Sequence, residues 1–160
     1  MIVNRSFKEF KFRHRSKKNQ IIYISKKIKN DQEVLNLIDN FLEEKNSFIF
    51  ESVEKGKVKG RYTIFGKNPD KIWEFNNQNS YLIKNNIKLK LKDKPAQLLE
   101  KIIEEFKFDT PKNLPKICSL ISGYFSYDSI RYIEKIPNSC KNDLNIPDVR
   151  LLRPRTLVIH

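Results

Sequence analysis

Residues 47–66, SFIFESVEKGKVKGRYTIFG, predict two β-strands joined by a loop, and this stretch decides the fold class of the chain. The first strand, 47–53, and the second strand, 61–65, are rich in the aromatic and β-branched residues that favour extended structure. The Lys- and Gly-rich segment between them contains Gly56 and Gly60 and is long for a tight hairpin, so we expect a longer loop. An antiparallel strand pair is therefore the expected centre of the fold.

A carboxylate directly follows the first of these strands. Glu51 and Ser52 come immediately after the apolar run Phe48–Phe50. A charged group beside a buried run is unfavourable unless an opposite charge or a hydrogen-bond donor pairs with it. Arg61 begins the facing strand and is the expected partner of Glu51 within the chain.

Length and composition fit one soluble globular domain. The chain has 160 residues, of which 39% are apolar and 32% charged, enough for one domain with a core. No run of 18 apolar residues predicts a membrane span, and the basic N-terminus lacks the apolar stretch of a secretory signal. Cys118 and Cys140 are too few and too widely spaced for a disulfide framework or a zinc site. We therefore expect free thiols and a cytoplasmic location.

The net charge of +13 is concentrated near the N-terminus. Residues 1–30 hold ten Lys or Arg and one acid, whereas residues 31–160 hold 22 Lys or Arg and 18 acids. A basic arm over residues 1–19 could follow a phosphate backbone, so a nucleic-acid-binding module is an alternative function. However, 24 Lys against 8 Arg, with 16 Asn and 20 Ile, is also what an AT-rich coding sequence produces. No RNA-binding aromatic motif or zinc-finger spacing accompanies the charge, which therefore does not favour this alternative.

Two further elements are expected before residue 47. Residues 20–25, QIIYIS, predict a short strand. Residues 31–44 predict an amphipathic helix with Asn30 or Asp31 as its N-cap. The apolar residues at helical spacing on its core-facing side are Val34, Leu35, Ile38, Phe41 and Leu42.

The pattern after residue 66 predicts alternating strands and turns, followed by a second helix. The expected elements are a turn (67–70), a strand (71–75), a turn (76–80), a strand (81–91) and a helix (96–106). In the last strand apolar residues largely alternate with Lys, as on an antiparallel edge with one wet face. Pro95 opens the helix, whose apolar stripe contains Leu98, Leu99, Ile102, Ile103 and Phe106.

A second motif, GYFSYDSIRYIEKIP, begins at Gly123. Gly123 allows close approach of a neighbouring backbone, and GYFSY predicts a buried strand. Asp128 is expected to N-cap a helix over 129–135. Asp128 could also be read as a catalytic acid, and Tyr124 and Tyr127 as a stacking platform. One cap and two half-buried tyrosines explain all three residues, so the structural interpretation is favoured.

Together the two motifs resemble component I of anthranilate synthase, a chorismate-using enzyme family. The first resembles an aromatic or aliphatic run followed by Glu-Ser-Val-Glu, a short loop and Gly-Arg-Tyr. The second resembles Gly-Tyr-x-x-Tyr-Asp-x-x-Arg-x-x-Glu, and residues 142–148 with Arg153-Pro154 match its continuation. The likeness covers most of residues 20–160 and favours anthranilate synthase over its relative in the folate pathway, aminodeoxychorismate synthase component I.

The chain departs from the family pattern at two places. No Pro precedes Pro69, although a Thr-Pro-Val triplet is common near the start of the first core helix. Ser119 and Leu120 stand where many members have a Gly-Gly pair. The first departure falls near the expected inhibitor site, whereas the second affects local backbone freedom only.

The resemblance implies the amino-terminal half of a two-domain fold. Residues 20–160 would form an α+β domain, an antiparallel twisted sheet with two or three packed helices. The chorismate-binding domain, which would supply acid/base residues and bind Mg²⁺, is absent from this sequence. No Cys/His or Ser/His/Asp arrangement replaces it, so we expect no catalytic residue, metal site or cofactor here, and no activity from the isolated chain. An excised domain, a split subunit and a truncated product all fit this interpretation.

The resemblance also implies feedback inhibition by tryptophan. Phe50, Glu51, Ser52 and Arg61 occupy the matching positions and are the expected inhibitor-binding residues. A carboxylate suits the ligand's ammonium, a cation or backbone donor suits its carboxylate, and an apolar wall suits its indole. The alternative is an ion pair between Glu51 and Arg61 that only joins two strands. Expected partners are a chorismate-binding domain, in the same or a separate chain, and a glutamine amidotransferase subunit, with no membrane.

Overall fold

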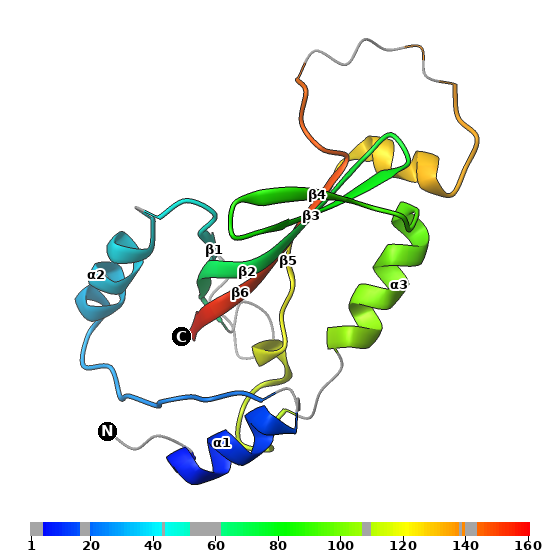
Figure 1. The fold of residues 1–160 in the computed structure, drawn as a ribbon. Helices are drawn as coiled ribbons and strands as arrows, with labels where there is room; N and C mark the ends of the chain where they lie inside the picture. The colour runs from blue at the N-terminus through cyan, green and yellow to red at the C-terminus, as the bar shows by residue number, and fades with distance from the viewer. Residues whose placement is uncertain are drawn as a thin grey trace.

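The fold is a mixed α+β domain built on one antiparallel sheet (Figure 1). The computed structural model describes residues 5–16, 20–42, 44–51, 62–106, 110–137, 139 and 144–160. Its α-helices are α1 (Phe7–Arg15), α2 (Asp31–Leu42) and α3 (Pro95–Phe106), and its 3₁₀-helices are η1 (Lys116–Cys118) and η2 (Tyr127–Tyr132). Its strands are β1 (Phe48–Phe50), β2 (Ile64–Asn76), β3 (Asn79–Lys84), β4 (Ile87–Leu91), β5 (Ser122–Phe125) and β6 (Val149–Ile159). The predicted α+β class and antiparallel sheet are confirmed.

Strand β2 organises the sheet. The strand order is β4-β3-β2-β6-β5, and β1 pairs with β2 outside this path. One edge of β2 pairs with β6 along most of its length, while the other edge pairs with β1 at residues 64–66 and with β3 at residues 72–76. The predicted pairing of the two strands in the first motif is confirmed, with Phe50 opposite Ile64 and Phe48 opposite Gly66.

The turn predicted over residues 67–70 is wrong, because β2 continues through it. The register between β2 and β6 shifts between Pro69 and Lys71, which marks a β-bulge. Pro69 lies opposite Pro154, and neither residue has an N–H to donate to the ladder. Asn68 has a φ of 53°, a left-handed conformation that Asn tolerates better than most residues. The turn residues therefore bend the strand without ending it.

The single strand predicted over 81–91 is two strands. A tight turn at Asn85 and Asn86 separates β3 from β4, and both residues have positive φ, 50° and 62°. Two left-handed central residues are typical of the type I′ hairpin turn. The predicted turn over 76–80 is shorter in the structure, where Asn77 and Gln78 connect β2 to β3.

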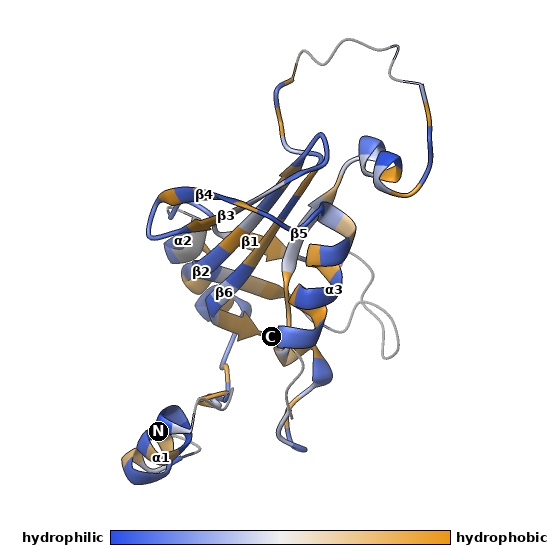
Figure 2. Cartoon of the chain, turned by 45° about the vertical axis from the view of Figure 1, so that its right-hand side comes forward, coloured by the Kyte–Doolittle hydropathy of each residue, from blue (hydrophilic) through white to orange (hydrophobic). Residues whose placement is uncertain are grey.

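Helix α3 covers one face of the sheet and completes the main core (Figure 2). This core consists of Trp73, Phe75, Leu98, Ile102, Val149 and Leu151. Leu98 and Ile102 confirm the predicted stripe of the helix, with Leu99 partly buried against it. Ile103 is 58% exposed, so the stripe is narrower than its apolar residues indicate.

Helix α2 packs against β1 and β2. Asn30 caps it, because the Asn30 side chain accepts a hydrogen bond from the Glu33 N–H at 3.1 Å. Val34 is buried as expected, but Leu35 is 51% exposed. The side chains of Phe41 and Leu42 lie outside the part of the chain that is described.

The N-terminal residues form a helix, and the strand predicted over 20–25 is absent. Residues 20–29 are extended, with a single bridge at Ile24. Helix α1, within the predicted basic arm, begins after the N-cap Ser6 and buries no residue. None of the helices in the described part of the chain is both long and apolar enough to cross a bilayer.

Candidate functional site

The predicted inhibitor-binding residues lie at and beyond the end of β1. Phe50 ends the strand and is 47% exposed, and Glu51 follows it and is exposed. Ser52 and Arg61 lie outside the described residues. The predicted contact between Glu51 and Arg61 therefore stays a prediction.

Strand β1 presents Phe50 on the same side of the sheet as a pocket. Phe50 lies opposite Ile64, and Ile64 lies opposite Ile159 of β6. Directly opposed residues share a face of an antiparallel sheet, so these three side chains lie on one face. Neighbouring strands are about 4.8 Å apart, which places Phe50 roughly 10 Å from Ile159. Ile159 lines the pocket, so an aromatic side chain of the predicted site and the pocket lie on one sheet face.

The pocket has a volume of about 930 Å³. It lies between the extended segment 20–26, residues 113–120 and the second half of β6. Its wall combines apolar, aromatic and ionisable side chains, among them Tyr23, Tyr62, Cys118, Arg153, Ile159 and His160. Such a mixed wall suits a ligand or a packed segment with both polar and apolar parts. Within the described ranges, no group of three or more His, Cys, Asp or Glu side chains could hold a metal ion.

An ion-pair network borders the pocket where β6 passes under α3. The Arg153 guanidinium donates two hydrogen bonds to the Asp70 carboxylate, one of them, from Nε, at 2.7 Å. Glu105 of α3 lies 3.6 Å from Arg153 and also pairs with Lys71. Burial opposes the charge on Asp70, but the hydrogen bonds and charge of Arg153 outweigh it and lower the pKa of Asp70. The hydrogen bond to Asp70 raises the pKa of Arg153 despite its burial. The network holds the bulged part of β2 against β6 and α3.

The Asp70–Arg153 pair makes stability depend on pH. Because the pKa of Asp70 is lowered from 3.8, the pair stabilises the fold above about pH 4 and loses this contribution as pH falls through the lower folded-state pKa. The variant Asp70→Asn should be less stable at pH 7 and lose less stability on acidification from pH 5 to pH 2.5. Urea denaturation across this range measures the effect. Asp39→Asn, on the exposed side of α2, is the control and should follow the wild-type slope; a wild-type slope in Asp70→Asn as well would contradict the prediction.

A second polar cluster surrounds the buried carboxylate of Glu74, which is 5% exposed. Arg150, opposite Glu74 on β6, pairs with one carboxylate oxygen. Lys88 of β4 contacts the other oxygen at 2.6 Å. Arg150 also donates to the Asn46 side chain at 2.7 Å, just before β1. Burying a carboxylate costs free energy unless charges or hydrogen bonds offset it, and here each oxygen has a cationic partner.

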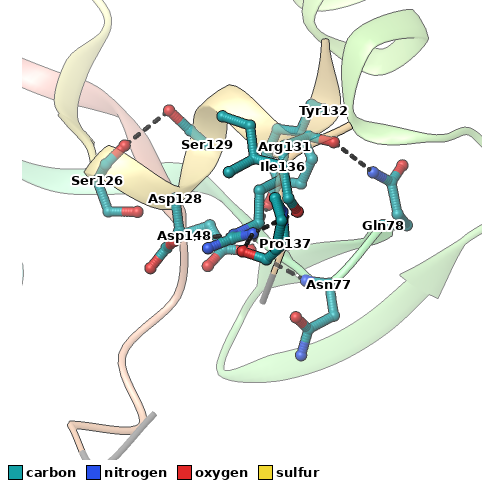
Figure 3. A network of polar contacts seen from close by, with 10 residues as sticks. All are labelled: Asn77, Gln78, Ser126, Asp128, Ser129, Arg131, Tyr132, Ile136, Pro137 and Asp148. Carbon is teal, nitrogen blue, oxygen red and sulfur yellow. Dashed lines mark hydrogen bonds and ion pairs between the residues drawn. The ribbon is translucent and has the colours of Figure 1, made fainter. Parts of the chain in front are cut away.

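The second motif forms a short 3₁₀-helix within a polar network (Figure 3). Arg131 lies at its centre. Its Nε donates to Asp128 at 2.9 Å, and its Nη1 donates to the carbonyl groups of Ile136 and Pro137, both at 2.8 Å. Gln78, in the turn after β2, donates to the Arg131 carbonyl at 3.2 Å. The network fixes the segment after η2 beside the β2–β3 turn.

Tyr132 and Asp148 join the ends of this network to the sheet. The Tyr132 hydroxyl donates to Asp148 at 2.7 Å, and the same carboxylate oxygen accepts from the Asn77 N–H at 3.0 Å. Burial and the adjacent Asp148 carboxylate raise the pKa of Tyr132. Tyr132 also packs edge-on against Phe75, so the network reaches the main core.

Three expectations about this motif are wrong. Asp128 is not an N-cap, because it lies inside η2 and binds Arg131, and the predicted helix over 129–135 is replaced by the earlier, tighter η2. The strand at Gly123 is not fully buried, since Tyr124 is 38% exposed and Tyr127 is 87% exposed. The expected close approach at Gly123 is confirmed: a Cβ there would lie 1.9 Å from the Arg150 carbonyl oxygen.

Comparison with known proteins finds relatives of this chain by sequence. The chain is 30% identical over 159 residues to anthranilate synthase component 1 of Cereibacter sphaeroides, covering 96% of the chain and 32% of that protein. It is 31% identical over 139 residues to the component 1 of Acetivibrio thermocellus, covering 86% of the chain and 28% of that protein. The chain is a partial-length relative of anthranilate synthase component I. No family model matches it.

The similarity extends to plant anthranilate synthases. The chain is 34% identical over 116 residues to the chloroplastic alpha subunit 2 of Arabidopsis thaliana, covering 66% of the chain and 19% of that subunit. It thus spans about a third or less of the length of each anthranilate synthase relative named here. The resemblance inferred from the two motifs is confirmed.

Sequence reasoning missed the polar clusters around Glu74 and Asp70. Glu74 stands between Trp73 and Phe75, an acid inside a predicted strand, which is a signal that it needs a partner. The partner, Arg150, lies far away in the sequence, and only the β2–β6 register brings the two together. The same holds for Asp70 and Arg153.

Proposed function

We propose that this chain is the amino-terminal regulatory and scaffold region of an anthranilate synthase component I. The synthase converts chorismate and glutamine or ammonia into anthranilate and pyruvate in tryptophan biosynthesis. The observation that carries the proposal is the match of 96% of the chain to 32% of one such component. A separate chorismate-binding domain would supply the chemistry and bind Mg²⁺, and a glutamine amidotransferase subunit would supply ammonia. The proposed location is the cytoplasm.

The regulatory part of the proposal concerns tryptophan. Phe50 lies half-exposed on the pocket side of the sheet, and Glu51 follows it at the surface. Phe50 would supply an apolar wall for an indole, and Glu51 would pair with the ligand's ammonium. Ser52 and Arg61 would complete the polar contacts to the amino-acid group. The exposure of Phe50 and Glu51 supports this assignment, because neither side chain is buried in the core and both could contact a ligand.

Removing the charge of Glu51 should weaken tryptophan inhibition. Glu51→Gln keeps the size of the side chain but loses the charge that would face the ammonium. A hydrogen bond to a charged group is worth about 1.5–3 kcal/mol, so the half-inhibiting tryptophan concentration should rise roughly ten- to hundredfold. The measurement is chorismate turnover at increasing tryptophan, with this chain assembled with a chorismate-binding domain. Ser52→Leu should reduce inhibition too, by adding bulk to the wall.

Glu100→Gln is the matched control, since Glu100 is an exposed carboxylate on α3. It should leave inhibition unchanged. If stable and active Glu51→Gln protein keeps wild-type inhibition, the assignment of the site is wrong. If Glu51→Gln instead unfolds, the structural alternative holds, in which Glu51 and Arg61 join two strands.

The isolated chain should make no anthranilate. Purified chain given chorismate, Mg²⁺ and ammonia should show no anthranilate fluorescence above a boiled control, because the proposal places the acid/base and metal-binding residues in the other domain. Addition of a separately expressed chorismate-binding domain should produce activity if the two parts assemble. Fluorescence from the isolated chain would show that these 160 residues hold a complete active site, against the proposal.

A further inference from the structure

The turn that precedes β1 is attached to the sheet at two points. Residues 44–47 connect α2 to β1, and the Ser47 hydroxyl and N–H both bond the Glu44 carbonyl. The Glu44 carboxylate pairs with Lys67 of β2. The Asn46 side chain accepts a hydrogen bond from Arg150 of β6 at 2.7 Å. The second attachment crosses from the turn to a strand that does not pair with β1.

Arg150 is held rigidly enough to act as an anchor. Its Nη1 pairs with Glu74, which is buried and receives Lys88 on its other oxygen. Its Nη2 is thereby directed to Asn46. A guanidinium donates from several N–H groups in one fixed plane, so fixing one side of the fork fixes the direction of the other. Asn46 itself has a φ of 62°, so the side-chain contact and the reversal of the chain occur at the same residue.

Strand β1 needs such an anchor because its own pairing is short. It has three residues, and among the described residues only Phe48, Ile49 and Phe50 of this segment pair with β2. An edge strand of this length has few hydrogen bonds to define its position, and such segments open locally most easily. The contact between Arg150 and Asn46 lies two residues before the first paired residue and four before Phe50. It therefore constrains the same short strand that ends at the candidate inhibitor site.

We propose that Glu74, Arg150 and Asn46 form a positioning relay that fixes β1, and that this relay sets the affinity for tryptophan at Phe50 and Glu51. The second half of the inference rests on the proposed function. None of the three residues touches the ligand in this scheme. They are positioning residues, and they act through the location of the strand.

Hydrogen exchange on the 160-residue chain tests the relay without reference to any ligand. Asn46→Gly removes the acceptor and keeps a residue that adopts positive φ readily. The β1 amides should exchange about tenfold faster, because a hydrogen bond to a charged group is lost. Arg150→Lys keeps a positive charge beside Glu74 but lacks the second arm of the fork, and should act in the same direction. The amides of β3 should not change in either variant.

Lys88→Met is the matched control for the cluster. It removes a partner of Glu74 but leaves the Arg150–Asn46 hydrogen bond in place, so β1 exchange should stay within about twofold of wild type. Unchanged β1 exchange in folded Asn46→Gly protein would overturn the relay. Faster exchange throughout the sheet would also overturn it, because that pattern indicates general destabilisation.

Tryptophan inhibition tests the regulatory half, on the chain assembled with a chorismate-binding domain. Asn46→Gly should raise the half-inhibiting tryptophan concentration about three- to tenfold, while kcat and KM for chorismate without tryptophan stay unchanged. Equal inhibition of the variant and wild type would overturn this half. A wild-type assembly that does not respond to tryptophan would overturn the proposed regulatory site instead, and the exchange experiment would still decide the relay.

Discussion

Replacing Gly123 by alanine is expected to lower the free energy of unfolding by about 3 kcal/mol or more. A Cβ at this position would lie 1.9 Å from the Arg150 carbonyl oxygen and 2.9 Å from the Leu151 Cα. Both are backbone atoms of β6, and neither can move without disturbing the β5–β6 ladder. Because β6 also pairs with β2, the displacement would spread into the centre of the sheet. Urea denaturation followed by far-UV circular dichroism measures the change.

Gly66→Ala is the matched control for this prediction. Its Cβ would lie 2.5 Å from the Phe48 ring, and the ring edge of a side chain can turn away. We expect a loss of about 1 kcal/mol, clearly smaller than that of Gly123→Ala. If the two variants lose the same free energy of unfolding, the close approach of β5 to β6 is not the reason that position 123 requires glycine.

Phe75→Ala is expected to destabilise the domain by about 3–5 kcal/mol. Phe75 is completely buried, packs in the core beneath α3 and meets the Tyr132 ring at a centroid distance of 6.4 Å. Its removal leaves a cavity bordered by two strands and the second motif, where three rigid parts of the fold meet. Because domains are typically stable by only about 5–15 kcal/mol, this loss would be a large fraction of the total stability.

Thermal and chemical denaturation of three variants separate the causes. Phe75→Leu keeps most of the apolar volume and should cost about 1 kcal/mol. Tyr127→Ala removes a ring that is 87% exposed and should change stability by less than about 0.5 kcal/mol. Equal losses of unfolding free energy in Phe75→Ala and Tyr127→Ala would show that the core beneath α3 does not determine the stability of the fold.

Helices α2 and α3 could be predicted from the sequence because their signals are local. Apolar residues at helical spacing and a capping Asn30 identify α2, and Pro95 with its following stripe identifies α3. The degree of burial along each stripe could not be predicted. Leu35 and Ile103 have the right spacing, but both side chains are more than half exposed.

The errors in predicting the sheet from the sequence have a common physical origin. Pro69 and its neighbours have turn chemistry, yet pairing with β6 keeps them in a bulged strand. Conversely, Asn85 and Asn86 interrupt an alternating pattern with no Gly or Pro, and their left-handed conformation became clear only in the structure. Residues 20–25 have strand composition but lie extended without a ladder. Whether a segment pairs depends on partners distant in the sequence, which composition does not specify.

The candidate site could be predicted only in part. The motif identified β1 and placed Phe50 and Glu51 together at its end. The pocket on the same sheet face and the attachment of Asn46 to Arg150 are products of the tertiary fold. Asp128 was assigned a capping role from local sequence alone, whereas the structure pairs it with Arg131 three residues later.

The pairing of β2 with β6 has a consequence for synthesis on the ribosome. Ile64 pairs with Ile159, so the second edge of β2 stays unpaired until β6, which lies far later in the sequence, has been translated. Until then a nascent chain holds β2 with one edge open and Trp73 and Phe75 without Val149 and Leu151 beside them. Contacts between such distant segments make folding slow, and unpaired edges favour association with other chains. We therefore expect this sheet to complete its folding only after β6 has left the ribosome.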